Sequence, residues 1–195
     1  MTEKIKNSRL SFGYWFKLFL IVAFPLHVWG LLMIFRDIEF ITERTNLWDA
    51  FGYSGYSLLF ILVESILLSV IVWALSLLLP KGWGESRMLA VTGSLFSILA
   101  GASIVDMAFH AFSEVRISKQ YLYGLKNFTA TTYALISAAV IAAMVISLLL
   151  ILKTNKGEKV FTEIFERVSM LGYLYLFLDA AGIAIVILRN LSEKY

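Results

Sequence analysis

MLAVTGSLFSILAGASIVDMAFHAFSE, residues 88–114, is the stretch that decides the fold. It begins as an uncharged apolar run close to the length needed to cross a bilayer, about 20 residues. It ends in Asp106, His110 and Glu114, which are four residues apart and therefore share one face of a helix. The stretch predicts a membrane-spanning helix that carries a polar stripe at one end.

The composition places the whole chain in a membrane. Of its 195 residues, 59% are hydrophobic and 16% are charged, and the mean hydropathy of +0.79 lies far above the range of soluble domains. The net charge of +3 comes without a basic run interleaved with aromatic residues, so nucleic acid is not expected as a partner. The chain has no cysteine, which excludes disulfides, thiolate metal sites and cysteine nucleophiles.

Five apolar runs separated by polar connections predict an all-α integral membrane protein. We expect a bundle of five transmembrane helices that forms a single domain over residues 1–195. Pro25 predicts a kink in the first helix, because it removes a backbone donor. Pro80 and the short connection 81–87 predict an antiparallel hairpin of the second and third helices. The expected spans are residues 18–35, 58–79, 88–112, 133–152 and 168–188.

A short amphipathic helix is expected at the membrane interface just before the last span. Apolar residues at helical spacing occupy one face of this segment, and charged residues occupy the opposite face, which is typical of helices that lie in the interface. The apolar face consists of Val160, Phe161, Ile164, Phe165 and Val168.

Small residues spaced by four recur on two of the predicted helices. Helices in lipid associate through close packing of small side chains. We therefore expect the third and fourth helices to pack through these two ridges. The first ridge consists of Gly93, Ser97 and Gly101, and the second consists of Ala134, Ala138 and Ala142.

The distribution of Lys and Arg indicates the topology. The N-terminal segment and the connections on its side carry ten of the 17 basic residues, and the other side carries seven. Cytoplasmic loops hold the excess of basic residues. We expect a multi-pass protein of the plasma membrane with its N-terminus in the cytoplasm and its C-terminus outside.

Five ionisable residues fall within the expected spans and are candidates for binding a proton or a cation. A charge at the centre of a span costs about 2.5–3.5 kcal/mol on insertion scales. At a rise of ~1.5 Å per residue, all five lie within about 15 Å of the outer ends of their helices. They are His27, Glu64, Asp106, His110 and Asp179.

Two arrangements of these residues are open from the sequence. In a structural arrangement, Asp106 orients His110 one turn away, and Tyr175 satisfies Asp179 one turn away. In a functional arrangement, Glu64, Asp106 and His110 line one pocket, and the remaining two ionisable residues complete its walls. The three acids outnumber the two histidines, so at least one carboxyl needs a proton, water, a bound cation or a partner side chain.

The sequence lacks the residue spacings that are typical of metal sites and of nucleophilic catalysis. Two imidazoles and two carboxylates would suit zinc or iron, but no helical H-E-x-x-H or E-x-x-H motif is present, so no metal or cofactor is expected. Ser103, Asp106 and His110 share a face, yet the first and last are about 10 Å apart along the axis. That is beyond the reach of a nucleophile and its base, so no catalytic residue is predicted.

These observations favour a non-enzymatic helical membrane module or subunit. It is expected to contact the lipid bilayer and to bind a lipid, a protein partner or further copies of itself. One alternative is a small proton- or cation-coupled transporter that works as an oligomer and uses the outer carboxyls. Another is a membrane-embedded enzyme that acts on lipid-linked substrates.

Overall fold

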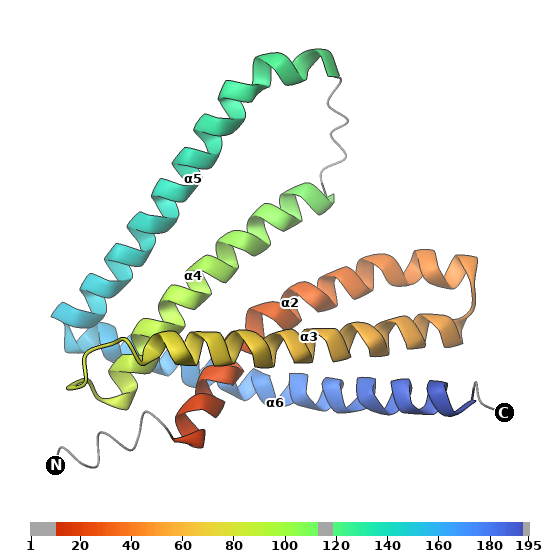
Figure 1. Cartoon of the computed structure of the whole chain (residues 1–195), viewed down its shortest axis with the longest axis horizontal. Helices are drawn as coiled ribbons and strands as arrows, with labels where there is room; N and C mark the ends of the chain where they lie inside the picture. Colours follow the sequence, from red (N-terminus) through yellow and green to blue (C-terminus); the bar gives the residue numbers. More distant parts are fainter. Residues whose placement is uncertain (1–10, 113–118, 193–195) are drawn as a thin grey trace.

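Five long helices account for nearly all of the part of the chain that the computed structural model describes, residues 11–112 and 119–192, and no strand occurs there (Figure 1). All five helices are long and apolar enough to cross a membrane. The prediction of an all-helical chain with five such helices is confirmed. The helices are α2 (Phe12–Arg44), α3 (Leu47–Ser76), α4 (Glu85–Phe112), α5 (Lys119–Lys153) and α6 (Asn155–Ser192).

The helices extend well beyond the apolar spans expected from the sequence. The polar connection expected over residues 36–52 is helical except at Thr45 and Asn46. Asn46 caps α3, because its side-chain oxygen accepts a hydrogen bond from the backbone N–H of Asp49 at 3.0 Å. At about 1.5 Å per residue, the 33 residues of α2 measure about 50 Å, more than the ~30 Å hydrocarbon core. α2 is therefore longer than a perpendicular crossing of the hydrocarbon requires.

The interfacial helix expected before the last span is not a separate element. Its residues form the first part of α6, which runs without interruption from Asn155 to Ser192. No proline or glycine lies between Glu158 and Leu171 to break the helix there. The chain instead reverses direction at Thr154, where Gly157 lies directly against the carbonyl of Leu150 at the end of α5.

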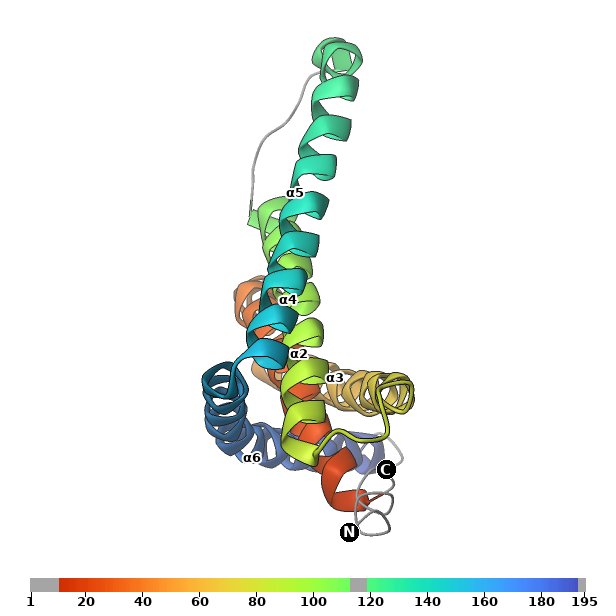
Figure 2. The same ribbon diagram turned by 90° about the vertical axis from the view of Figure 1, so that its left-hand side faces the viewer.

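The helices form two groups that diverge from a shared end. α2, α3 and α6 run side by side, whereas α4 and α5 form a second hairpin that leaves the first group at an angle (Figures 1 and 2). α2 changes direction between its first and second halves in Figure 1, as expected for a helix with Pro25 inside it. Because of this divergence, the C-terminal part of α4 and the N-terminal part of α5 lie away from the three-helix group.

The densest core lies where the two groups meet. Leu18 and Val22 of α2 are fully buried there with Met88 of α4 and Phe165 of α6. α5 joins this region through Ile151, which is fully buried. Only 11% of the most apolar stretch of α5 is buried, compared with 50% for α2, so the rest of the described chain leaves most of α5 uncovered.

The two small-residue ridges are not in contact, contrary to expectation. Gly93 lies against Phe165 of α6, and a Cβ at Gly93 would meet that ring at 2.8 Å. Gly101 has no heavy atom within 4 Å of a built Cβ. Ser97 is half-buried beside a cavity, and the alanines of the second ridge face outward. α4 turns the first ridge toward α2 and α6 and not toward α5. The exposed residues of the second ridge are Ala134, Ala138 and Ala142.

The closest small-residue contact joins α3 and α6 instead. A Cβ at Gly55 would meet the carbonyl oxygen of Gly182 at 3.1 Å, and a Cβ at Gly182 would meet that of Gly55 at 3.2 Å. Both glycines are buried. The two backbones can approach this closely because neither helix presents a side chain at the crossing.

Candidate functional site

A histidine and an aspartate form a buried pair between α2 and α6. The side chains of His27 and Asp179 are 1% and 2% exposed, and Nε2 of the imidazole lies 3.1 and 3.2 Å from the two carboxylate oxygens. Pro25, two residues before His27, is also buried. The pair therefore sits inside the three-helix group, next to the position where α2 can bend.

The second imidazole nitrogen fixes the tautomer. Nδ1 of His27 lies 2.8 Å from the carbonyl oxygen of Ala23, one turn earlier in α2. A carbonyl oxygen can only accept, so Nδ1 must carry a hydrogen. Nε2 then either accepts a hydrogen bond from a protonated Asp179 or, in the imidazolium, donates one to the carboxylate. A neutral imidazole facing an ionised carboxylate would set lone pairs against each other, so one proton is shared between the two groups.

The shared proton leaves the pair without net charge in either form. Gaining a second proton would leave a buried cation, and losing the shared one would leave a buried anion, and both are costly in a medium of low polarity. The pair can hold a proton and connect two helices. Both nitrogens of the ring are engaged, so the imidazole has no free position for a metal ion.

Tyr175 contacts this pair through its ring. The ring is stacked on the imidazole of His27, with 4.9 Å between the ring centroids and 21° between their planes. In the structural arrangement expected from the sequence, Tyr175 satisfies Asp179, one turn later in α6. The structure gives that role to His27, which is 152 positions away in the chain.

The three remaining ionisable candidates are not gathered around this pair. Glu64 is exposed on α3, and Asp106 is exposed on α4. α4 leaves α3 at an angle beyond the region where the two groups meet (Figure 1). Glu64 lies 12 residues before the end of α3 and Asp106 lies 21 residues after the start of α4, so the two carboxyls are about 18 and 32 Å along their helices from the α3–α4 connection. His110 belongs to α4, and its side chain lies outside the described residues. The expected pocket shared by Glu64 and Asp106 is therefore not formed within the described chain.

No metal centre is formed by the residues whose positions are described. Among them, no three His, Asp, Glu or Cys side chains lie close enough to hold one ion. His27 and Asp179 have each other as partners, and Glu64 and Asp106 are exposed on two different helices.

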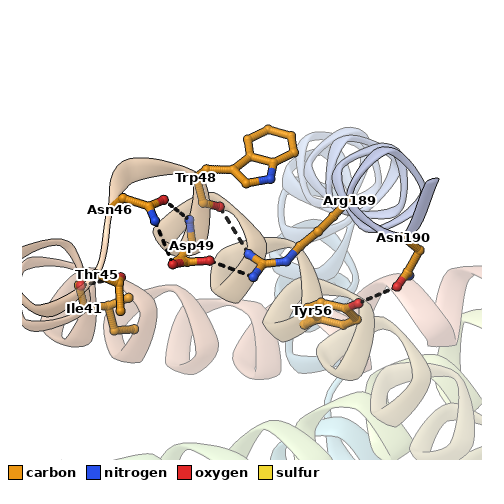
Figure 3. A network of polar contacts seen from close by, with 8 residues as sticks. All are labelled: Ile41, Thr45, Asn46, Trp48, Asp49, Tyr56, Arg189 and Asn190. Atoms are coloured by element: carbon orange, nitrogen blue, oxygen red, sulfur yellow. Dashed lines mark hydrogen bonds and ion pairs between the residues drawn. The ribbon is translucent and has the colours of Figure 1, made fainter. Parts of the chain in front are cut away.

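A polar network ties α6 to the start of α3 (Figure 3). Arg189 donates to a carboxylate oxygen of Asp49 at 2.7 Å and to the carbonyl of Trp48 at 3.3 Å. Tyr56 donates to the side-chain oxygen of Asn190 at 3.2 Å. Sequence reasoning missed these residues because long-range pairs leave no periodic signal.

A second polar cluster joins α4 to the start of α6. Ser86 and Arg87 both donate to the carboxylate of Glu158, at 2.6 and 2.8 Å. Lys17 of α2 forms an ion pair with Glu85 at 2.7 Å. Exposed ion pairs contribute at most about 1 kcal/mol each, so these contacts mainly set the register of the helix ends.

An apolar cavity of about 390 Å³ lies between α2, α4 and α6. Its lining includes Phe24, Ser97 and Gly101, which explains why a side chain at Gly101 would meet open space. The two serines on its wall are the main polar groups, and the hydroxyl of one of them, Ser94, donates to the carbonyl of Val91. A cavity of this character stays dry or admits hydrocarbon.

Comparisons with protein-family models, with curated proteins and with solved structures find no match to this chain. Function is therefore inferred from the geometry of the molecule.

Proposed function

We propose that the protein is a non-enzymatic membrane subunit that binds another membrane-spanning protein through α3. The observation that carries this proposal is the position of Glu64. It lies 12 residues before Ser76 and 17 after Leu47, so it is about 18 and 26 Å from the two helix ends. A carboxyl at that depth lies inside a hydrocarbon core of ~30 Å.

The surroundings of Glu64 make this position costly in an isolated subunit. Its neighbours on the exposed surface of α3 are large apolar residues, among them Phe60, Leu67 and Ile71. No residue that the structure describes forms a hydrogen bond or ion pair with Glu64. Intramembrane carboxyls of this kind face a cavity or a partner. A partner helix packed on α3 would remove Glu64 from lipid.

The intramembrane carboxyl of Asp179 needs no partner from outside the chain. Asp179 is neutralised by His27, which supports a structural role for that pair. The transporter and enzyme alternatives would need a shared pocket of reactive groups, and Glu64 and Asp106 lie on separate exposed surfaces. Assembly with a partner is the function that these positions support best.

Photocrosslinking tests the proposal. A photoreactive amino acid in place of Leu67, which is 59% exposed beside Glu64, is expected to give a protein–protein adduct of one defined mass in native membranes. The same substitution at Leu135, 67% exposed on α5, serves as the matched control and is expected to give lipid adducts. Lipid adducts alone at both positions would contradict the proposal.

The orientation in the membrane is proposed from the charge distribution. The N-terminus and the α3–α4 connection lie in the cytoplasm, the C-terminus and the α2–α3 connection lie outside, and the first part of α6 lies at the cytoplasmic membrane surface. Two observations support this orientation: the ten-to-seven excess of basic residues on the first side and the odd number of spanning helices in the described chain.

Single-cysteine labelling checks this orientation, because the natural chain has no cysteine that would give background. A cysteine at Gly82, where a Cβ meets nothing within 4 Å, is expected to react only after the membrane is permeabilised. A cysteine at Thr45, in the α2–α3 connection, is expected to react with an impermeant reagent in intact cells. Reaction of both sites from the same face would overturn the proposed orientation.

A further inference from the structure

We propose that the partner of α3 is a membrane-spanning helix of another protein that carries a lysine or arginine near the middle of the bilayer. This inference rests on the proposed function and names the chemistry of the partner at the same surface. The basic residue would form an ion pair with Glu64. Charge complementarity and the residue pattern around Glu64 both support it.

A second copy of this chain cannot supply the opposite charge through the same surface. A twofold dimer brings identical patches together, so α3 would face α3. The helix Leu47–Ser76 contains Asp49 and Glu64 as its charged residues and has no Lys, Arg or His. Self-association through α3 would therefore bring a second carboxyl toward the first.

The protein already shows how a carboxyl at this depth is neutralised. A side chain at Gly30 of α2 would press against Ile61 of α3, so these two residues are at the same level. His27 precedes Gly30 by three residues and Glu64 follows Ile61 by three, and the two helices are antiparallel. His27 and Glu64 are thus level with each other. The imidazole is committed to Asp179 inside the bundle, and Glu64 faces outward at the same level.

The exposed surface around Glu64 has the spacing of a helix–helix seam. Phe60, Glu64, Leu67 and Ile71 are separated by four, three and four residues, and all are exposed. This is the 3.5-residue repeat by which two helices pack side by side along a left-handed crossing. One polar residue in such a seam fixes the register of the partner. The seam therefore predicts a helical partner with its basic residue level with Glu64.

A peptide-binding experiment tests this inference with defined probes. The full-length protein, labelled with a donor dye on a cysteine at Gly82, is placed in phosphatidylcholine nanodiscs with an acceptor-labelled leucine–alanine peptide of spanning length. The peptide carries lysine, leucine or glutamate at its centre. Energy transfer is expected to show that the lysine peptide binds about tenfold more tightly than the leucine peptide, since intramembrane polar contacts are worth roughly one such factor.

Two variants separate the role of Glu64 from general effects. E64Q is expected to reduce binding of the lysine peptide to the level of the leucine peptide, while D106N, on another helix, leaves it unchanged. Equal binding of all three peptides to the natural protein would overturn the inference. So would preference for the glutamate peptide, or self-association that E64Q abolishes, because either result indicates paired carboxyls between copies. If the photoreactive residue at position 67 captures the same protein in the E64Q variant as in the natural protein, the proposed function stands and only the basic partner is excluded.

Discussion

Replacing His27 by leucine is expected to destabilise the protein by ~3–5 kcal/mol, the usual cost of removing one member of a buried ion pair. Asp179 is 2% exposed and has His27 as its hydrogen-bonding partner at 3.1 Å. Without the imidazole, the carboxyl must either stay ionised in a medium of low polarity or keep a proton with no acceptor for it. Reversible unfolding in mixed micelles would measure the loss.

The double substitution His27→Leu with Asp179→Leu provides the decisive comparison. Replacing a buried pair by apolar residues of similar volume is often neutral or stabilising. The double variant is therefore expected to recover most of the stability lost by the single one. Asp179→Asn should be milder than His27→Leu, because an amide N–H can still donate to Nε2. If the double variant is as unstable as the sum of the single ones, the two side chains are not coupled.

Replacing Gly182 by leucine is expected to destabilise the packing of α3 on α6, by at least the ~1–3 kcal/mol typical of overpacking. A Cβ there would lie 2.9 Å from that of Leu58 and 3.2 Å from the carbonyl oxygen of Gly55. The oxygen belongs to a helix backbone and cannot rotate away, so the two helices must separate. Thermal unfolding in nanodiscs would report the change.

Gly101→Leu is the matched control for this prediction. Gly101 also lies within a spanning helix, but a Cβ there meets no heavy atom within 4 Å, and the residue lines the apolar cavity between α2, α4 and α6. Leucine at this position is expected to leave stability unchanged or to raise it by filling the cavity. Equal destabilisation by Gly182→Leu and Gly101→Leu would contradict the importance of the α3–α6 crossing.

Hydropathy located the five helices but not their ends. Apolar runs report where hydrocarbon surrounds the chain, whereas a helix continues as long as its backbone bonds are made. Residues 36–44 are largely polar and still helical, and α2 ends at Arg44, just before the cap of α3 at Asn46. The amphipathic segment before the last span is also helical, because its backbone bonds continue, and it forms the first part of α6.

The sequence identified the costly residues but could not pair them correctly. Counting residues from helix ends gives the depth of His27, Glu64 and Asp179, whereas pairing depends on which helices are neighbours and which faces they turn to each other. Helix periodicity is a local property, and His27 and Asp179 are 152 positions apart. Glu64 and Asp106 belong to consecutive helices, yet the divergence of α4 from α3 separates them.

Small residues were misleading for a related reason. Regular spacing by four made Gly93 and Gly101 stand out, but a shared face says nothing of what lies opposite it. Gly55 lies between the polar connection expected over residues 36–52 and the span expected to begin at residue 58, and Gly182 lies within the last expected span. Their mutual approach depends on the crossing of α3 and α6, which only the three-dimensional arrangement reveals.

The hydrogen bond from Nδ1 of His27 to the carbonyl of Ala23 bears on the order of events during biosynthesis. Both residues belong to α2, so this bond can form as soon as the first spanning helix enters the bilayer. Nε2 of the neutral imidazole then remains available as a hydrogen-bond acceptor while three further helices are made. Asp179 enters with the last helix and can insert as the uncharged acid. Its carboxyl group can then donate a hydrogen bond to Nε2 of His27. The bundle therefore closes only when the final helix arrives, and a chain truncated before α6 would be left with an unmatched imidazole in the membrane.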